Sequence, residues 1–233
     1  MVTGASSGIG KATAIYLADL GASLVISGRN SERLLHTQAL LKGMGHISIV
    51  SDLATLEDAS CIYEQAVSDG VKLDGLVHCA GIIPTVPLQQ LTREKLRYIM
   101  DVNLYSFVEM VRQYAKRKYS NGGSIAIVSS IASVQPEACQ TIYSASKSAM
   151  NASVQALSFE LIKRRIRINT ILPGIVNPDK KDLEENEMAH LESQQLLGLI
   201  NSNDVAGAIA FLLSDMAKFI TGRNLYFDAG RFR

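Results

Sequence analysis

The chain has 233 residues, of which 47% are apolar and 19% are charged, and its formal net charge is +1. This composition supplies enough apolar side chains for one sizeable core and is too apolar for a disordered chain. A net charge near zero gives no electrostatic reason to expect nucleic acid or an anionic membrane as the main partner.

The three cysteines, Cys61, Cys79 and Cys139, are scattered along the chain, and the histidines form no HExxH-like cluster. We therefore expect no bound metal and a reducing, intracellular setting. The opening MVTGASSGIG does not have the pattern of a signal peptide, and no uninterrupted apolar stretch of about 18 residues is present. The sequence thus predicts a soluble, cytoplasmic protein.

Short β-branched runs alternate with longer helical patterns along the chain, which is typical of βαβ units around a parallel sheet. Only Met1 and Val2 precede the first glycine cluster. A first strand there is shorter than the usual ~5 residues, so either the native chain begins upstream or a short strand suffices. The other predicted strands are Ser23–Ser27, Ile47–Ser51, Gly75–His78, Ser124–Ser129, Arg167–Leu172 and Asn224–Phe227.

Helical spacing lies between these runs, and the last helical pattern has a buried face of Val205, Ile209 and Leu212 with Asp204 as its expected cap. The pattern predicts one domain over residues 1–233, an α/β fold with a single Rossmann-type doubly wound parallel sheet and helices on both faces. The other predicted helices are Lys11–Leu20, Ser31–Lys42, Leu56–Ser68, Arg93–Lys118 and Ile142–Arg164.

The glycine cluster Thr3-Gly4-Ala5-Ser6-Ser7-Gly8-Ile9-Gly10 lies between the short first strand and a helix. Glycines allow a tight turn and close approach of a pyrophosphate, and the N-terminus of the helix offers unpaired N–H groups. In isolation such a cluster is also compatible with a plain turn. Its position at the start of a βαβ unit favours dinucleotide binding.

The end of the second predicted strand reads Ile26-Ser27-Gly28-Arg29-Asn30, with no carboxylate before Glu32. An acidic residue at this point typically binds the ribose hydroxyls of NAD, whereas an arginine suits the 2′-phosphate of NADP. Arg29 therefore favours NADP(H), although it could also be a solvated loop charge.

Tyr143 and Lys147 are one turn apart at the start of a predicted helix, so the phenol and the ammonium share a helical face. A nearby ammonium lowers the pKa of a tyrosine, and a proton donor with a pKa nearer neutrality is a better general acid. Alone, this pair is also what an exposed helix would show by chance.

The joint pattern resembles the short-chain dehydrogenase/reductase family across nearly the whole chain, in particular its 3-oxoacyl-carrier-protein reductases. Ser130 precedes Tyr143 by the family's usual spacing, and Asn103 matches its helix asparagine. Asp228-Ala229-Gly230 resembles its C-terminal DGG motif. The resemblance implies an NADP(H) site at Gly4, Ser6, Ser7, Gly8, Ile9, Gly10, Arg29, Asn30, Asp52, Leu53, Cys79, Ala80, Gly81, Tyr143, Lys147, Pro173, Gly174 and Val176.

The resemblance also implies catalytic roles. Tyr143 would exchange a proton with the substrate oxygen, and Ser130 would orient that oxygen. Lys147 would hold the nicotinamide ribose and tune Tyr143, while Asn103 would support a water that connects Lys147 to solvent. Ser129 is the alternative serine, but it should point to the opposite face of its strand.

Two positions depart from the family pattern. His78 and Cys79 replace the asparagines of its NNAG motif, and we expect both to pack as structural residues rather than to react. Pro178 stands where a threonine usually binds the nicotinamide carboxamide, and Asn177 could substitute for it.

A polar segment near residues 177–199 lies where the family has its substrate lid, and it does not identify the substrate. The basic runs Lys116-Arg117-Lys118 and Lys163-Arg164-Arg165 could dock an acidic acyl carrier protein, although helix C-termini favour cations anyway. In the family, the equivalents of the long helices pair between subunits, so we expect a homotetramer or at least a homodimer. Ala149, Ala152 and Ala156 would permit that approach, or they pack within the subunit.

Three functions remain open at this point. The first is a ketone-reducing enzyme, in its sharpest form a 3-oxoacyl thioester reductase. The second is a sugar or polyol dehydrogenase on the same scaffold. The third is an NADPH-binding sensor without turnover, against which the complete Asn-Ser-Tyr-Lys set argues.

Overall fold

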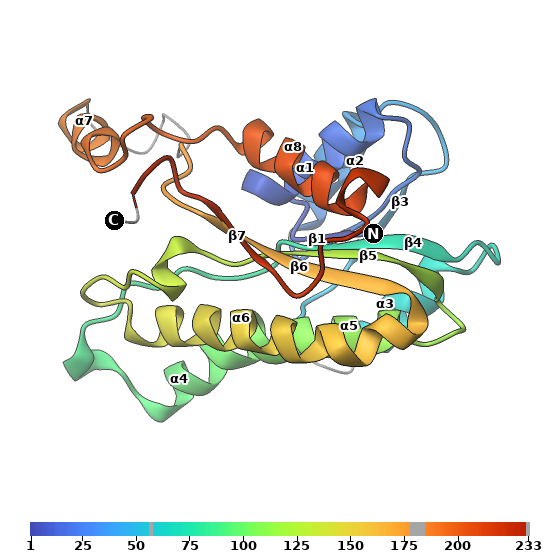
Figure 1. Ribbon diagram of the computed structural model, residues 1–233, viewed down its shortest axis with the longest axis horizontal. Helices are drawn as coiled ribbons and strands as arrows, with labels where there is room; N and C mark the ends of the chain where they lie inside the picture. Colours follow the sequence, from blue (N-terminus) through green and yellow to red (C-terminus); the bar gives the residue numbers. More distant parts are fainter. Residues whose placement is uncertain (56–57, 178–184, 232–233) are drawn as a thin grey trace.

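The computed structural model describes residues 1–55, 58–177 and 185–231. In this part of the chain, parallel strands form one seven-stranded sheet in the order β3-β2-β1-β4-β5-β6-β7 (Figure 1). The predicted doubly wound α/β fold is confirmed. The strands are β1 (Val2–Thr3), β2 (Val25–Gly28), β3 (Ile47–Val50), β4 (Leu73–His78), β5 (Ser120–Val128), β6 (Ile166–Pro173) and β7 (Asn224–Phe227).

The short strand β1 lies in the middle of the sheet. Val2 is level with Ile26 of β2 and with Val77 of β4, so two residues are enough to join both neighbours. The strand order reverses direction between β1 and β4. Ligands of open α/β sheets bind at such a switch point, beyond the carboxyl ends of the strands.

Helices cover both faces of the sheet (Figure 1). One layer packs on a core that includes Val2, Ile26 and Ile209, and the other on a core that includes Phe107, Ile125 and Met150. The first layer consists of α1 (Gly8–Asp19), α2 (Ser31–Ala39) and α8 (Ser202–Leu213), and the second of α3 (Asp58–Ala66), α4 (Arg93–Met100), α5 (Ser106–Tyr114) and α6 (Thr141–Leu161).

Two sequence expectations about helices are wrong in detail. The helix predicted over Arg93–Lys118 is interrupted by the π-helical turn η2 (Asp101–Tyr105), because one extra residue per turn lets Asn103 reach inward to the backbone of Ile82. The cap of α8 is Asn201, whose side chain accepts a hydrogen bond from Asn203 N, and Asp204 lies in the first turn instead.

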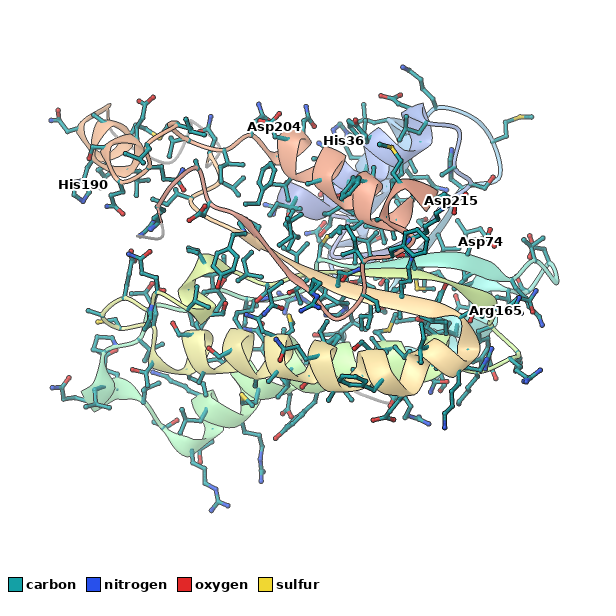
Figure 2. All side chains as sticks on the ribbon, in the orientation of Figure 1. His36, Asp74, Arg165, His190, Asp204 and Asp215 are labelled. Carbon is teal, nitrogen blue, oxygen red and sulfur yellow. The ribbon has the colours of Figure 1, made fainter. Side chains whose placement is uncertain are left out.

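The carboxyl ends of the strands face α7 (Glu185–Ser193) and the C-terminal segment. In Figure 2, His190 of α7 lies at the left margin of the molecule. Asp74 near the start of β4 and Arg165 before β6 lie toward the opposite side. The candidate site is therefore at the left side of this view, between the sheet and the α7 region.

Candidate active site

A cavity of about 990 Å³ lies at the carboxyl ends of the strands. It runs from the glycine turn before α1 to the segment between β5 and α6. The predicted residues that line it are Gly4, Ser6, Ser7, Gly8, Ile9, Gly10, Arg29, Asn30, Asp52, Leu53, Cys79, Ala80, Gly81, Ser130, Tyr143, Lys147, Pro173, Gly174 and Val176.

The glycine turn forms a cradle with no room for a side chain at Gly4 or Gly10. A Cβ on Gly4 would lie 2.7 Å from Ala80 N, and a Cβ on Gly10 would overlap the carbonyl oxygen of Gly4. Helix α1 begins at Gly8, which has a φ of 51°, and a Cβ on this residue would point into open space. Ser7, at the N-cap, makes no side-chain capping hydrogen bond among the described residues. The first N–H groups of α1 therefore face an open space that suits a pyrophosphate.

Two arginines stand at the end of β2. Arg29 and Arg33 both line the cavity, and Arg29 Nη1 donates a 3.2 Å hydrogen bond to Tyr98 Oη of α4. The Asn30 side chain caps α2 by accepting from Arg33 N at 2.8 Å. Arg33 was not predicted from the sequence, because it reaches the cavity from the first turn of α2, one turn after the end of β2. The pair makes this corner suitable for a phosphate group.

The pair Asp52 and Leu53 borders the same corner from the end of β3. Leu53 is buried, and the carboxylate of Asp52 accepts from Ala54 N at 3.0 Å, which fixes the turn. This arrangement can offer an apolar contact and a polar edge to a nucleobase.

The two replacements in the NNAG-like motif fill the space between β4 and its neighbours. His78 is fully buried, with Nδ1 3.1 Å from Thr3 Oγ1. Burial raises the pKa of the Cys79 thiol to about 12, so this sulfur stays neutral near pH 7. Both observations support packing roles, in line with the sequence expectation.

Ser130, Tyr143 and Lys147 meet on one wall of the cavity. Ser130 follows β5 and its Oγ accepts from Ala132 N at 3.1 Å, while a hydrogen bond also links its hydroxyl to Tyr143. Lys147 is buried, and its Nζ donates to Val128 O at 2.9 Å. Ser129 is turned to the backbone of α6, where its Oγ donates to Lys147 O at 3.4 Å.

Burial, and not the charge of Lys147, has the largest effect on the pKa of Tyr143. Burial raises the pKa of Tyr143 above its usual value, and only the hydrogen bond with Ser130 works in the opposite direction. Burial also lowers the pKa of Lys147 to about 8, so the amine is still mostly charged near pH 7. The expectation of a tyrosine with a lowered pKa is therefore wrong for this structure, because desolvation outweighs the hydrogen bond with Ser130.

Asn103 lies behind the wall rather than on it. Its Oδ1 accepts from Ile82 N at 2.8 Å, and its Nδ2 donates to Ile82 O at 3.1 Å and to Ser146 Oγ at 3.1 Å. The buried amide thus ties η2 to the segment after β4 and to α6. A Cβ on Gly81 would lie 3.5 Å from Lys147 Nζ, which shows how near this segment passes to the ammonium.

The turn after β6 is held by a residue that sequence reasoning missed. Gln195 is buried; its Oε1 accepts from Ile175 N at 2.6 Å, and its Nε2 donates to Ile175 O at 3.0 Å and to Gly198 O at 2.9 Å. Asn177 is exposed and does not line the cavity, and Pro178 lies outside the described residues. Nothing in the sequence distinguishes Gln195 from the neighbouring Gln194.

The far end of the cavity is lined by residues that were not named as site residues from the sequence, although Leu191 and Gln194 lie within the predicted lid segment near 177–199. They come from the segment between Ser130 and Tyr143, from α7 and the residues after it, and from the C-terminal segment. Among them Glu137 and Arg231 form an ion pair. The lining residues at this end are Ile131, Ala132, Gln135, Glu137, Gln140, Leu191, Gln194 and Arg231.

The described ranges contain neither a metal-binding cluster nor a helix that could span a membrane. There, no three His, Cys, Asp or Glu side chains gather as a metal-binding group. Within the same ranges, every helix is too short or too polar to span a bilayer.

Comparison with known proteins agrees with this geometry. A family model described as enoyl-(acyl carrier protein) reductase matches residues 4–231. The chain is 34% identical to the 3-oxoacyl-(acyl-carrier-protein) reductase FabG of Rickettsia felis, covering 99% of this chain and 95% of that protein. It is 33% identical to the L-rhamnose 1-dehydrogenase (NAD(P)(+)) of a Sphingomonas species, covering 100% and 95%.

Solved structures of dehydrogenases agree with the sequence relatives. A dehydrogenase/reductase from Sinorhizobium meliloti superposes with a TM-score of 0.92 at 29% identity, covering 100% of this chain and 94% of that chain. The matches extend over the glycine turn, the sheet and the Ser-Tyr-Lys wall alike. The chain belongs to the short-chain dehydrogenase/reductase family of oxidoreductases.

Proposed function

We propose that the protein is an NADP(H)-dependent enzyme that interconverts a carbonyl and an alcohol on a small molecule. The observation that carries this proposal is the placement of Ser130, Tyr143 and Lys147 on one wall of a cavity whose other end is the glycine cradle. A dinucleotide laid from the cradle along the carboxyl ends of the strands would bring its nicotinamide toward that wall.

The residues present fit such a cofactor. The N-terminus of α1 and the cradle at Gly4 and Gly10 would hold the pyrophosphate, and Pro173 with Gly174 would border the nicotinamide. When bound, NADPH supplies a hydride to the carbonyl carbon and leaves as NADP⁺. The protein contributes position and the proton.

Proton transfer would run through the Ser130–Tyr143 pair. As the carbonyl carbon accepts the hydride, its oxygen gains an electron pair and takes the proton of the Tyr143 hydroxyl. Ser130 would donate a hydrogen bond to the same oxygen. Lys147, still charged near pH 7, would stabilise the phenolate that forms and bind the ribose. Asn103 would act mainly by holding η2 and α6 in register, since its amide is already bonded to Ile82 and Ser146.

Preference for NADP(H) over NAD(H) rests on the corner at the end of β2. Arg29 and Arg33 line it. A bidentate guanidinium–phosphate contact would bind the 2′-phosphate, which NAD lacks. The rhamnose dehydrogenase relative is named for use of either nucleotide, and titration with NADPH and NADH tests the preference.

Two substrate classes remain candidates, and each has a relative behind it. One is a 3-oxoacyl thioester, as in the name of the Rickettsia reductase, and the other is a sugar or polyol, as in the name of the rhamnose dehydrogenase. Docking of an acidic carrier protein on the basic runs has less support. Arg164 donates to the carbonyl oxygens of Ala115 and Ser120, and Lys118 pairs with Glu64, so these charges are partly occupied.

We also propose that the protein is cytoplasmic and forms a homo-oligomer of two or four subunits. Ala149 packs against the core, as the within-subunit alternative expects, but Ala152 and Ala156 are exposed on α6 next to Phe159, which is 79% exposed. An apolar helix face of this kind suits contact with a second subunit. A monomeric mass by light scattering would contradict the oligomer.

The first experiment is fluorescence titration with NADPH and NADH, followed by turnover assays on carbonyl substrates with the wild type and Tyr143→Phe. We expect tight NADPH binding in both proteins and a loss of kcat of roughly 10²- to 10⁴-fold in the variant. Tyr105→Phe, a matched change at an exposed tyrosine outside the cavity, should leave kcat unchanged. Binding without turnover would favour the sensor function, and absence of binding would refute the proposal.

A further inference from the structure

The far end of the cavity carries a charged pair that the proton chemistry does not use. Glu137 lies between Ser130 and Tyr143 in the sequence, and Arg231 comes from the C-terminal segment, yet their side chains form an ion pair. Both line the cavity. The pair therefore shares a cavity with Ser130, Tyr143 and Lys147 and does not lie on a remote surface.

Arg231 has few partners for a side chain so well covered. Its side chain is 12% exposed, and its Nη2 bonds Glu137 Oε1. Across the described part of the chain, no other residue accepts a hydrogen bond from this guanidinium. An arginine has five N–H donors, so Nε and Nη1, which have no acceptor among the described residues, can each bind one more group. Burial accordingly lowers the pKa of Arg231 below its usual value.

Glu137 offers the complementary chemistry. Its side chain is 47% exposed, and its other carboxylate oxygen, Oε2, accepts a 3.3 Å hydrogen bond from Gln140 Nε2. Each oxygen has a further lone pair. The pair thus presents hydrogen-bond donors from Arg231 and acceptors from Glu137.

A hydroxyl group suits this arrangement better than the alternatives. It donates and accepts at once, so neighbouring hydroxyls can bond Glu137 and Arg231 together. A substrate carboxylate would face repulsion from Glu137. An acyl chain would remove water from the ion pair and replace none of its hydrogen bonds, which costs free energy.

We propose that Glu137 and Arg231 bind adjacent hydroxyl groups of a small, neutral, polyhydroxylated substrate, a sugar or polyol, beside Ser130 and Tyr143. The inference rests on the proposed function and selects one of its two substrate classes. Gln135, Gln140 and Gln194 extend the polar lining around the pair.

The test compares two kinds of substrate. Purified enzyme is assayed with NADP⁺ on neutral aldoses and alditols of four to six carbons, and with NADPH on two hydroxyl-poor ketones, 2,3-butanedione and acetoacetyl-N-acetylcysteamine. The variants are Glu137→Gln and Arg231→Met, with Arg223→Met, an exposed arginine outside the cavity, as the matched control. NADPH affinity by fluorescence reports whether the cofactor site stays intact.

We expect turnover of at least one sugar or polyol, and a fall in its kcat/KM by roughly 10- to 100-fold in both variants. Turnover of the hydroxyl-poor ketones and NADPH affinity should change by less than about threefold, and Arg223→Met should match the wild type. An equal fall on both kinds of substrate would show a merely structural pair and overturn the inference.

Turnover of the ketones without turnover of any sugar or polyol would also overturn the inference. The proposed function would still stand if Tyr143→Phe abolishes the turnover of the ketones. Failure of NADPH binding, or turnover that survives Tyr143→Phe, would refute the proposed function itself. The two failures are therefore distinguishable.

Discussion

The two ends of the cavity are constructed in different ways. At the cofactor end, backbone touches backbone: Gly4 lies against Ala80, and Gly10 lies against Gly4. At the substrate end, side chains from separate parts of the chain meet, as Glu137 and Arg231 do. Close backbone contact admits only glycine, whereas a contact between side chains can be made by many residue pairs. The cofactor end should therefore tolerate few substitutions and the substrate end many.

The largest effect is expected for Gly10→Ala. Its Cβ would overlap the Gly4 carbonyl oxygen, so the free energy of unfolding should fall by about 3 kcal/mol and NADPH binding should be lost. Gly21→Ala is the control, because a Cβ there meets open space, although its φ of 89° adds a backbone strain that Gly10 does not have. It should cost about 1–2 kcal/mol and leave NADPH affinity unchanged. A Gly10→Ala protein that binds NADPH normally would contradict the claim that the cofactor end tolerates few substitutions.

A smaller effect is expected where the substrate end is tied to the turn after β6. Gln195→Leu leaves the backbone groups of Ile175 and Gly198 without their partner, which should lower the free energy of unfolding by about 2 kcal/mol. Urea unfolding measures this change. Gln65→Leu, at an exposed glutamine of α3, should change stability by less than about 0.5 kcal/mol. Equal results for both variants would contradict the role of Gln195.

Removal of Arg29 should affect affinity more than stability. Arg29→Ala is expected to reduce the ratio of NADPH to NADH affinity about tenfold, or ~1.4 kcal/mol, because a charged hydrogen bond to the 2′-phosphate is lost. Fluorescence titration of both nucleotides gives the ratio. Arg117→Ala, an exposed arginine away from the cavity, should leave it unchanged. An unaltered ratio in Arg29→Ala would place the preference for NADP(H) elsewhere.

The smallest change in stability is expected for Gln194→Ala at the substrate end. Its amide is 3.0 Å from His190 Nε2 in an exposed contact, so the free energy of unfolding should change by less than about 0.5 kcal/mol. Its position in the cavity lining should nevertheless alter kcat/KM about threefold, or ~0.6 kcal/mol. A large loss of stability would show that this end is as constrained as the glycine cradle.

The same contrast explains what could be read from the sequence. The cradle depends on glycines that are close together in the chain and on strand ends that the alternating pattern locates. Asn103 was found by its motif, but the π-helical turn that presents it was not, because the apolar period runs through Arg93–Lys118 without a break signal.

The substrate end could not be predicted in this way. Glu137, Gln194 and Arg231 are brought together only by the complete fold, and each residue type is common on protein surfaces. The pKa of Tyr143 was misjudged for a related reason. Its depth of burial, which decides the direction of the shift, is a property of the packed structure and not of the spacing to Lys147.

The buried imidazole of His78 has a consequence for the behaviour of the protein in acid. Burial, together with the charge of Lys147, lowers its pKa from 6.5 to about 3. Between these values the unfolded chain binds a proton that the folded protein does not, so this residue lowers the free energy of unfolding by ~1.4 kcal/mol per pH unit as the pH falls. His78→Asn should show a smaller loss between pH 6 and 5 in urea unfolding, and an equal loss would contradict this account. A side chain at the centre of the sheet would then contribute directly to the loss of stability in acid.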